Sequence, residues 1–219
     1  MICKAGHYEP IAREGHIFVV PPLLLSFLLW WLGHPWISLG LLVLACLIAM
    51  FFRNPERVPP HGDGIVISPC DGRVVEIVQD TESDNIPGEP LQRMSIFMSI
   101  FNVHVNRWPV SGVVQKIQHV DGSFLDARDP KASSTNEHNS VVVQSGDKSM
   151  EVVQIAGKIA RRIACWVYEG DRVQQGDRFG LIRFGSRVDV YLPKDFSFVV
   201  PIGTKVRAGV TIIARETDA

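Results

Sequence analysis

The stretch GDRVQQGD, residues 170–177, is followed by a similar stretch, PIGTKVRAG, residues 201–209. Each contains a valine three positions before a glycine, at Val173–Gly176 and Val206–Gly209. Glycine adopts a positive φ at little cost, so glycines at such offsets are typical of tight turns between strands. The repeated V-x-x-G pattern therefore predicts that this part of the chain consists of short β-strands joined by tight turns.

The β pattern extends over most of the chain. From Gly64 onward, short runs of alternating or β-branched residues are bounded by Gly, Pro and Asp, which is typical of a sandwich or barrel. The polar segment Gly122–Asn139 has no clear period and predicts a long loop, a feature that is often functional. We expect strands at Ile65–Ser68, Arg73–Gln79, Met94–Val103, Val113–Val120, Ser140–Gln144, Met150–Ile155, Arg162–Val167, Phe179–Phe184, Arg187–Leu192 and Val210–Ala214.

The V-x-x-G pattern resembles the barrel-sandwich hybrid of biotinyl and lipoyl carrier domains. We therefore predict a mainly β, barrel-sandwich-hybrid-like domain over residues 58–219. This resemblance concerns architecture, because one fold supports many unrelated functions.

The N-terminal part contains two uncharged apolar segments, residues 17–32 and 36–52, separated by Gly33-His34-Pro35. As helices they would each reach roughly 24–26 Å, which is short of the ~30 Å hydrocarbon core of a bilayer. We therefore predict either a hairpin of two short hydrophobic helices or a segment that dips into the bilayer and returns, and we assign residues 1–57 to a membrane-anchor region. A cleaved signal peptide is the alternative, although the first 16 residues include Glu9 and Glu14, which are unusual before a signal sequence.

Basic residues flank the apolar pair on both sides. Lys4 and Arg13 precede it, and Arg53 and Arg57 follow it. Because positive charge is retained on the cytoplasmic side, we expect both ends of the pair and the following domain to face the cytoplasm at the cell membrane.

The overall charge and the cysteines exclude other classes of function. The formal net charge is −1, with 22 basic and 23 acidic residues, so we do not expect a nucleic-acid partner. The four cysteines, Cys3, Cys46, Cys70 and Cys165, are widely scattered and form no cluster with metal-ligand spacing. We therefore predict no metal site.

The dipeptide Gly185-Ser186 lies between two predicted strands, about 30–35 residues before the C-terminus. Spacing alone predicts a hairpin turn here, and the same dipeptide occurs at Gly122-Ser123. Three further motifs precede it in the order FRNPER (52–57), SPCDGRV (68–74) and FNVHVNRWPVSG (101–112). Together with Gly185-Ser186 they resemble the short form of the phosphatidylserine decarboxylases, over about Phe52 to Ala214.

The resemblance implies a pyruvoyl enzyme that cuts its own chain. The hydroxyl of Ser186 would attack the carbonyl of Gly185, and the resulting ester would eliminate and hydrolyse to a pyruvoyl group at residue 186. Fragments 1–185 and 186–219 would stay together as a heterodimer, which could assemble further. The pyruvoyl group would then serve as the electron sink for converting phosphatidylserine, a membrane phospholipid, to phosphatidylethanolamine.

The resemblance also suggests roles for other residues. Asp71 would orient a histidine during self-cleavage, with a plain turn residue before Gly72 as the alternative. His104 would act as base for Ser186 or as proton donor to the substrate, and its alternative is an ordinary strand histidine. The longer branch of the family has a second histidine where this chain has Arg107. Because arginine stays protonated, Arg107 cannot be a base; it is a candidate for binding the substrate phosphate or carboxylate.

Asn136, Glu137 and His138 close the polar loop and are further candidates for lining the substrate site, unless they are a solvated loop end. Two other classes of function remain as alternatives. A membrane-tethered biotinyl or lipoyl carrier would need a lysine at a hairpin tip, and Lys148 lies outside the V-x-x-G pattern. A β-rich metallopeptidase would need paired ligands beside His104.

Overall fold

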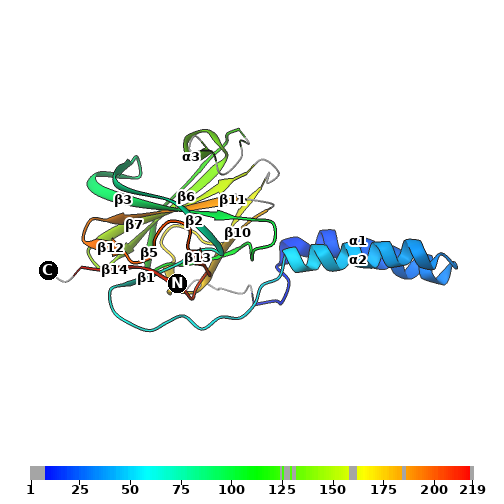
Figure 1. The fold of residues 1–219 in the computed structure, drawn as a ribbon. Coiled ribbons are helices and arrows are strands. Elements are labelled where there is room, and N and C mark those ends of the chain that lie inside the picture. The colour runs from blue at the N-terminus through cyan, green and yellow to red at the C-terminus, as the bar shows by residue number, and fades with distance from the viewer. Residues whose placement is uncertain are drawn as a thin grey trace. The chain divides into compact units, whose positions relative to one another are not determined.

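The computed structural model describes residues 8–123, 125, 129, 132–157, 162–183 and 186–217. The chain divides into two compact units, a helical one that ends at Glu56 and a β-rich one that begins at Arg57 (Figure 1). The fold is mainly β with an N-terminal apolar helical part, so the predicted fold class is confirmed.

The helical unit is a hairpin of α1 (Arg13–Trp31) and α2 (Pro35–Phe51). Its turn follows the predicted break: Gly33 has a φ of +82°, a conformation that favours glycine, and Pro35 starts α2, where its missing N–H costs nothing. The helices contact each other through Ser26, whose Oγ donates to the Ser38 carbonyl at 2.8 Å.

Most apolar side chains of these two helices are exposed, including Trp31 and Trp36. By length and composition α1 is able to cross a membrane, and α2, with 17 residues, is a shorter apolar helix. An N-terminal signal sequence has the same length and composition.

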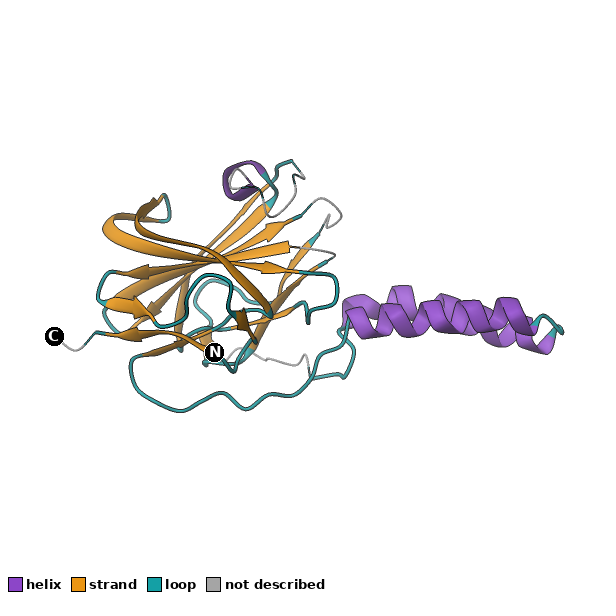
Figure 2. Ribbon diagram, in the orientation of Figure 1, coloured by secondary structure: helices purple, strands orange, loops and turns teal. Residues whose placement is uncertain are grey.

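The β unit is organised around an eight-stranded antiparallel sheet that curls on itself (Figure 2). Its strand order is β13-β2-β3-β11-β7-β6-β5-β9. The strands are β2 (Gly72–Ser83), β3 (Ile86–Met98), β5 (Gly112–Val120), β6 (His138–Ser145), β7 (Lys148–Ala156), β9 (Arg172–Val173), β11 (Ser186–Pro193) and β13 (Lys205–Val206).

Two three-stranded sheets complete the unit, with the orders β1-β14-β12 and β4-β10-β8. Their strands are β1 (Ile65–Ile67), β4 (Val105–Arg107), β8 (Ile163–Cys165), β10 (Arg178–Ile182), β12 (Phe196–Phe198) and β14 (Ile212–Glu216). The main apolar core contains Val188 and Val190 from the large sheet together with Trp108, Phe179 and Ile213.

The structure differs from the predicted strands in several respects. β10 pairs with β4 and β8, whereas β11 pairs with β3 and β7, so the hairpin expected across Gly185-Ser186 is wrong. β3 begins at Ile86, eight residues before the predicted start, because the β2–β3 hairpin continues past the apolar run. Its tip is fixed to β7 by Glu151, which accepts hydrogen bonds from Ser83 and Asn85. Within the predicted long loop, α3 (Ala132–Thr135) forms a single helical turn.

Candidate active site

Ser186 is the first residue of β11, at the centre of the large sheet. It pairs with Met98 of β3 on one side and with Ala156 of β7 on the other, and it is completely buried. Its Oγ donates to the Met98 sulfur at 3.4 Å. A thioether is a weak acceptor, so the hydroxyl proton is held only loosely. Gly185 lies outside the described residues.

His104 directly precedes β4 and is completely buried. Its carbonyl accepts from Ile182 N at 3.4 Å, so it lies beside the last residue of β10, four positions before Ser186. Its Nδ1 is 3.0 Å from the Asn102 carbonyl. A carbonyl can only accept, so Nδ1 carries a proton, and in the neutral ring Nε2 is then the basic nitrogen.

A layer of buried amides lies next to Ser186, and no sequence motif singled it out. Asn106 Nδ2 is 3.9 Å from the same Met98 sulfur, and its Oδ1 accepts from Gln154 Nε2 at 2.8 Å. Asn139 Nδ2 in turn donates to Gln154 Oε1 at 3.2 Å. These amides orient one another, because each oxygen must meet an N–H.

Asp71 and Arg57 form a buried pair that connects two of the sequence motifs. The guanidinium of Arg57 binds both carboxylate oxygens of Asp71, at 2.5 and 2.9 Å, and also donates to the Ala208 carbonyl. Asp71 Oδ1 accepts a further hydrogen bond from Ala208 N at 2.8 Å. These contacts favour a structural role in holding the turn after β13 in place, and the orientation of a histidine by Asp71 stays a prediction.

Arg107 is 4% exposed and donates to the Gly176 carbonyl at 2.7 Å. Its side chain packs so closely on Gly209 that a Cβ there would lie 2.7 Å from Arg107 Cδ. Glycines of both V-x-x-G stretches, Gly176 and Gly209, therefore contact the Arg107 side chain, which favours a structural role for Arg107. Binding of substrate by Arg107 stays a prediction.

The candidates in the polar loop lie at the same end of the sheet as Ser186. The buried Asn136 side chain donates to the carbonyls of Leu125 and Ala156 and accepts from Leu125 N. The carbonyl of Glu137 accepts from Ala156 N at 2.9 Å, and His138 pairs with Ile155. Because Ala156 is the register partner of Ser186, Asn136 fixes this loop one strand away from the serine.

A cluster of buried charges lies immediately after Ser186. Arg187, 2% exposed, donates to Asp189 at 2.6 Å, to Ser95 Oγ at 2.6 Å and to Glu76 at 3.0 Å. Glu76 also pairs with Arg93 at 2.9 Å. The alternation of charged and apolar residues in SRVDVYLP could have indicated this cluster, because alternate residues of a strand face opposite sides.

The buried thiol of Cys70, near Asp71 and Asp189, is not suited to nucleophilic chemistry. Burial raises the pKa of Cys70 well above its usual value, and the negative charges of Asp71 and Asp189 raise it further. A thiol must be deprotonated to attack, so Cys70 is an inert core residue.

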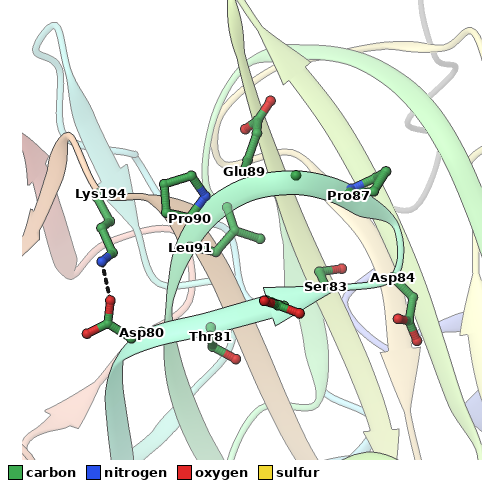
Figure 3. A pocket seen from close by; sticks show the side chains of 11 residues that line it. Asp80, Thr81, Ser83, Asp84, Pro87, Glu89, Pro90, Leu91 and Lys194 are labelled. Carbon is green, nitrogen blue, oxygen red and sulfur yellow. Dashed lines mark hydrogen bonds and ion pairs between the residues drawn. The ribbon is translucent and has the colours of Figure 1, made fainter.

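One surface hollow, with a volume of about 860 Å³, is not at Ser186. It lies inside the β2–β3 hairpin, between residues 80–84, residues 87–91 and Lys194, whose amine binds Asp80 (Figure 3). Leu91 pairs with Pro193 at the far end of β11, about 23 Å along the strand from Ser186. Among the described residues, no group of three or more His, Cys, Asp or Glu side chains is arranged to hold a metal ion.

Known proteins are similar to this chain over nearly its whole length. The family model for phosphatidylserine decarboxylase matches residues 44–214. A curated relative, the phosphatidylserine decarboxylase proenzyme of Syntrophus aciditrophicus (strain SB), is 46% identical over 205 residues, which cover 93% of this chain and 96% of the relative. A match of this extent and identity means that the chain belongs to the phosphatidylserine decarboxylase family.

Proposed function

We propose that this chain decarboxylates phosphatidylserine to phosphatidylethanolamine with a pyruvoyl group made from its own Ser186. Membership of the family supports the reaction. The position of Ser186 supports the rest: it is a buried serine at the start of a central strand, and the carbonyl of the buried His104 accepts a hydrogen bond from the last residue of β10, the strand before it in the chain.

Self-cleavage needs only groups of the chain and one water molecule. Ser186 Oγ attacks the Gly185 carbonyl, and the peptide bond between residues 185 and 186 is replaced by an ester. Loss of the Cα proton expels the Gly185 carboxylate and leaves dehydroalanine at residue 186. Hydrolysis of dehydroalanine then releases ammonia and forms the pyruvoyl group.

His104 is the proposed base for this attack. A hydroxyl is a weak nucleophile and needs a base within reach. The hydrogen bond from Nδ1 to the Asn102 carbonyl fixes the ring and makes Nε2 the proton acceptor. In the mature enzyme the same nitrogen would hold the proton that replaces carbon dioxide on the product.

The surroundings of Ser186 fit a pyruvoyl group. Residue 186 is held between β3 and β7 by a register that continues to Pro193 on one side and Tyr191 on the other. The new terminus would therefore stay in place after the chain is cut, next to Met98 and Ala156, in a site from which water is largely excluded. The group would supply an electron sink for loss of the carboxylate.

The remaining candidates have supporting roles in this proposal. Asn136, Glu137 and His138 would form one wall of the substrate site, and Arg107 and Asp71 would hold the strands and turns around it. The helical hairpin α1–α2 would anchor the enzyme in the membrane, with the β unit on the cytoplasmic side, and fragments 1–185 and 186–219 would stay paired.

A carrier function is not favoured. The amine of Lys148, at the tip of the β6–β7 hairpin, is bound by Asp195 and Glu216, and these carboxylates raise its pKa to about 12. An amine that stays protonated is a poor acceptor for a biotinyl or lipoyl group.

The decisive experiment is a denaturing gel with intact-mass analysis of the purified full chain. We expect two fragments, with the N-terminus of the smaller one blocked. Ser186→Ala should remain a single chain, and Ser123→Ala, at the other Gly-Ser dipeptide, should be cut normally. His104→Ala should slow the cut by about 10²–10⁴-fold, the usual contribution of a general base. An active enzyme with an intact bond between residues 185 and 186 would overturn the proposal.

A further inference from the structure

The turn between β3 and β4 exposes two large apolar side chains. Its central residues are Ile100, 47% exposed, and Phe101, 70% exposed. Turn centres are normally occupied by Gly, Pro, Asn, Asp or Ser, each for a conformational reason. Two adjacent large apolar residues have no such reason, and exposed apolar clusters often mark a contact surface.

Hydrogen bonds hold this turn in one conformation. Asn102 N donates to the Ser99 carbonyl at 3.0 Å, and Asn102 Oδ1 accepts from both the N–H and the Oγ of Ser99, each at 2.8 Å. Because Ser99 and Asn102 are joined by these hydrogen bonds, the backbone of the turn is fixed and the central side chains are exposed.

The turn is joined to the candidate active site at both ends. It directly follows Met98, which pairs with Ser186 and accepts its hydroxyl hydrogen bond. On its other side, the Asn102 carbonyl accepts from His104 Nδ1. A surface that touches Ile100 and Phe101 is therefore close to both proposed catalytic residues.

Other residues around Ser186 fit the same kind of partner. Leu125, 37% exposed, is held by Asn136 on the β7 side of the serine. The exposed Arg162 and the half-buried Arg183 lie at the ends of β8 and β10, where Arg183 N donates to the Arg162 carbonyl. Apolar side chains together with arginines complement a surface of acyl chains and anionic headgroups.

We propose that the turn Ser99–Asn102 is a membrane-contacting element, which inserts Ile100 and Phe101 into the bilayer that contains the substrate. In this arrangement the site at Ser186 receives the serine headgroup at the membrane surface, and the lipid does not have to leave the bilayer. The inference rests on the proposed function, because it takes the substrate to be a membrane phospholipid.

The test compares two forms of the substrate. The full-length double variant Ile100→Ser/Phe101→Ser is assayed on phosphatidylserine in phosphatidylcholine vesicles and on a short-chain phosphatidylserine dispersed as monomers. We expect the activity on vesicles to fall about tenfold more than the activity on monomers, because only the vesicle reaction uses the lost apolar contact. Self-cleavage should proceed to completion.

Tyr168→Ser is the matched control. Tyr168 is 79% exposed, but its loop lies at the opposite end of the sheet, where Gly170 N donates to Val114 at the start of β5. The ratio of the two activities should not change in this variant. Equal losses on both substrates in the double variant, or no loss on either, would overturn the proposal.

A second measurement is independent of catalysis. A photoreactive phenylalanine analogue at position 101 of the uncut Ser186→Ala chain, reconstituted in the same vesicles, should give a lipid adduct. An adduct to a second copy of the chain, or none, would contradict the membrane contact. If this variant gives a lipid adduct but the parent chain, with Ser186 present, is never cut, the membrane contact is supported and the pyruvoyl proposal is overturned.

Discussion

Both faces of β11 are buried near Ser186, but they differ in chemistry. On one face Val188, Val190 and Leu192 are fully buried in the main apolar core, in line with Ser186. On the other face Arg187 and Asp189 are also buried, at 2% and 0% exposure, but they form ion pairs and hydrogen bonds.

The comparison distinguishes the contacts that stabilise the strand from the contacts that determine its position. Apolar burial is strong but has little directionality, so many similar side chains would serve. The guanidinium of Arg187 has three partners in fixed directions, from β2, β3 and β11 itself. We infer that the apolar face stabilises the fold and that the charged face determines where Ser186 lies.

The largest effect is expected from Arg187→Met. The substitution removes the guanidinium that binds the buried Asp189, and loss of one partner of a buried ion pair typically costs about 3–5 kcal/mol. We predict a loss of this size in urea unfolding of the uncut Ser186→Ala background, and slower self-cleavage when Ser186 is present. Arg187→Lys keeps the charge but not the planar fork, so its loss should be smaller. A loss below about 1 kcal/mol for the methionine variant would mean that the charged face does not hold the strand.

A moderate effect is expected from Leu192→Ala on the apolar face. Truncation of a fully buried leucine removes apolar contacts and leaves a cavity, at a cost of about 2–4 kcal/mol. Because Leu192 is six residues from Ser186, protein that folds should cut itself at the normal rate. Urea unfolding and the gel assay measure the two effects. A slowed cut in folded protein would show that the core face also positions the serine.

The smallest effect is expected from Tyr191→Phe and depends on pH. Burial raises the pKa of Tyr191, and the nearby charge of Asp189 raises it further. A raised pKa gives a contribution that is complete below the unfolded value of about 10 and is lost as the pH rises through the folded value. Above about pH 10, the unfolding free energy of the parent should fall more steeply than that of Tyr191→Phe, by at most about 1.4 kcal/mol per pH unit. Parallel pH profiles would contradict the burial of the phenol.

The sequence predicted the helices and strands better than it predicted which strands pair with each other. The apolar segments 17–32 and 36–52 correspond to α1 and α2, and the β-branched run from Val113 to Val120 corresponds to β5. The hairpin expected at Gly185-Ser186 was wrong because strand periodicity describes the faces of a strand and not its neighbours. The tip of the β2–β3 hairpin was missed because Pro87, Gly88 and Pro90 are typical of a loop.

At the candidate site, too, the sequence predicted individual residues but not their contacts. The motifs identified Ser186 and His104 as candidates for chemistry. They could not identify Asn106 and Gln154, because a single amide in a strand has no distinctive pattern until another amide meets it. They also could not pair Asp71 with Arg57, since the two lie in different motifs.

The sequence by itself determined the β class, the apolar hairpin, the family resemblance and the serine on which the proposed chemistry depends. These follow from local pattern and residue type, which a linear chain carries. Only the tertiary structure decided that β11 lies between β3 and β7, that His104 ends up beside β10, and that Arg187 is buried among carboxylates. These depend on contacts between residues far apart in the chain, which form only when the strands close around a shared core.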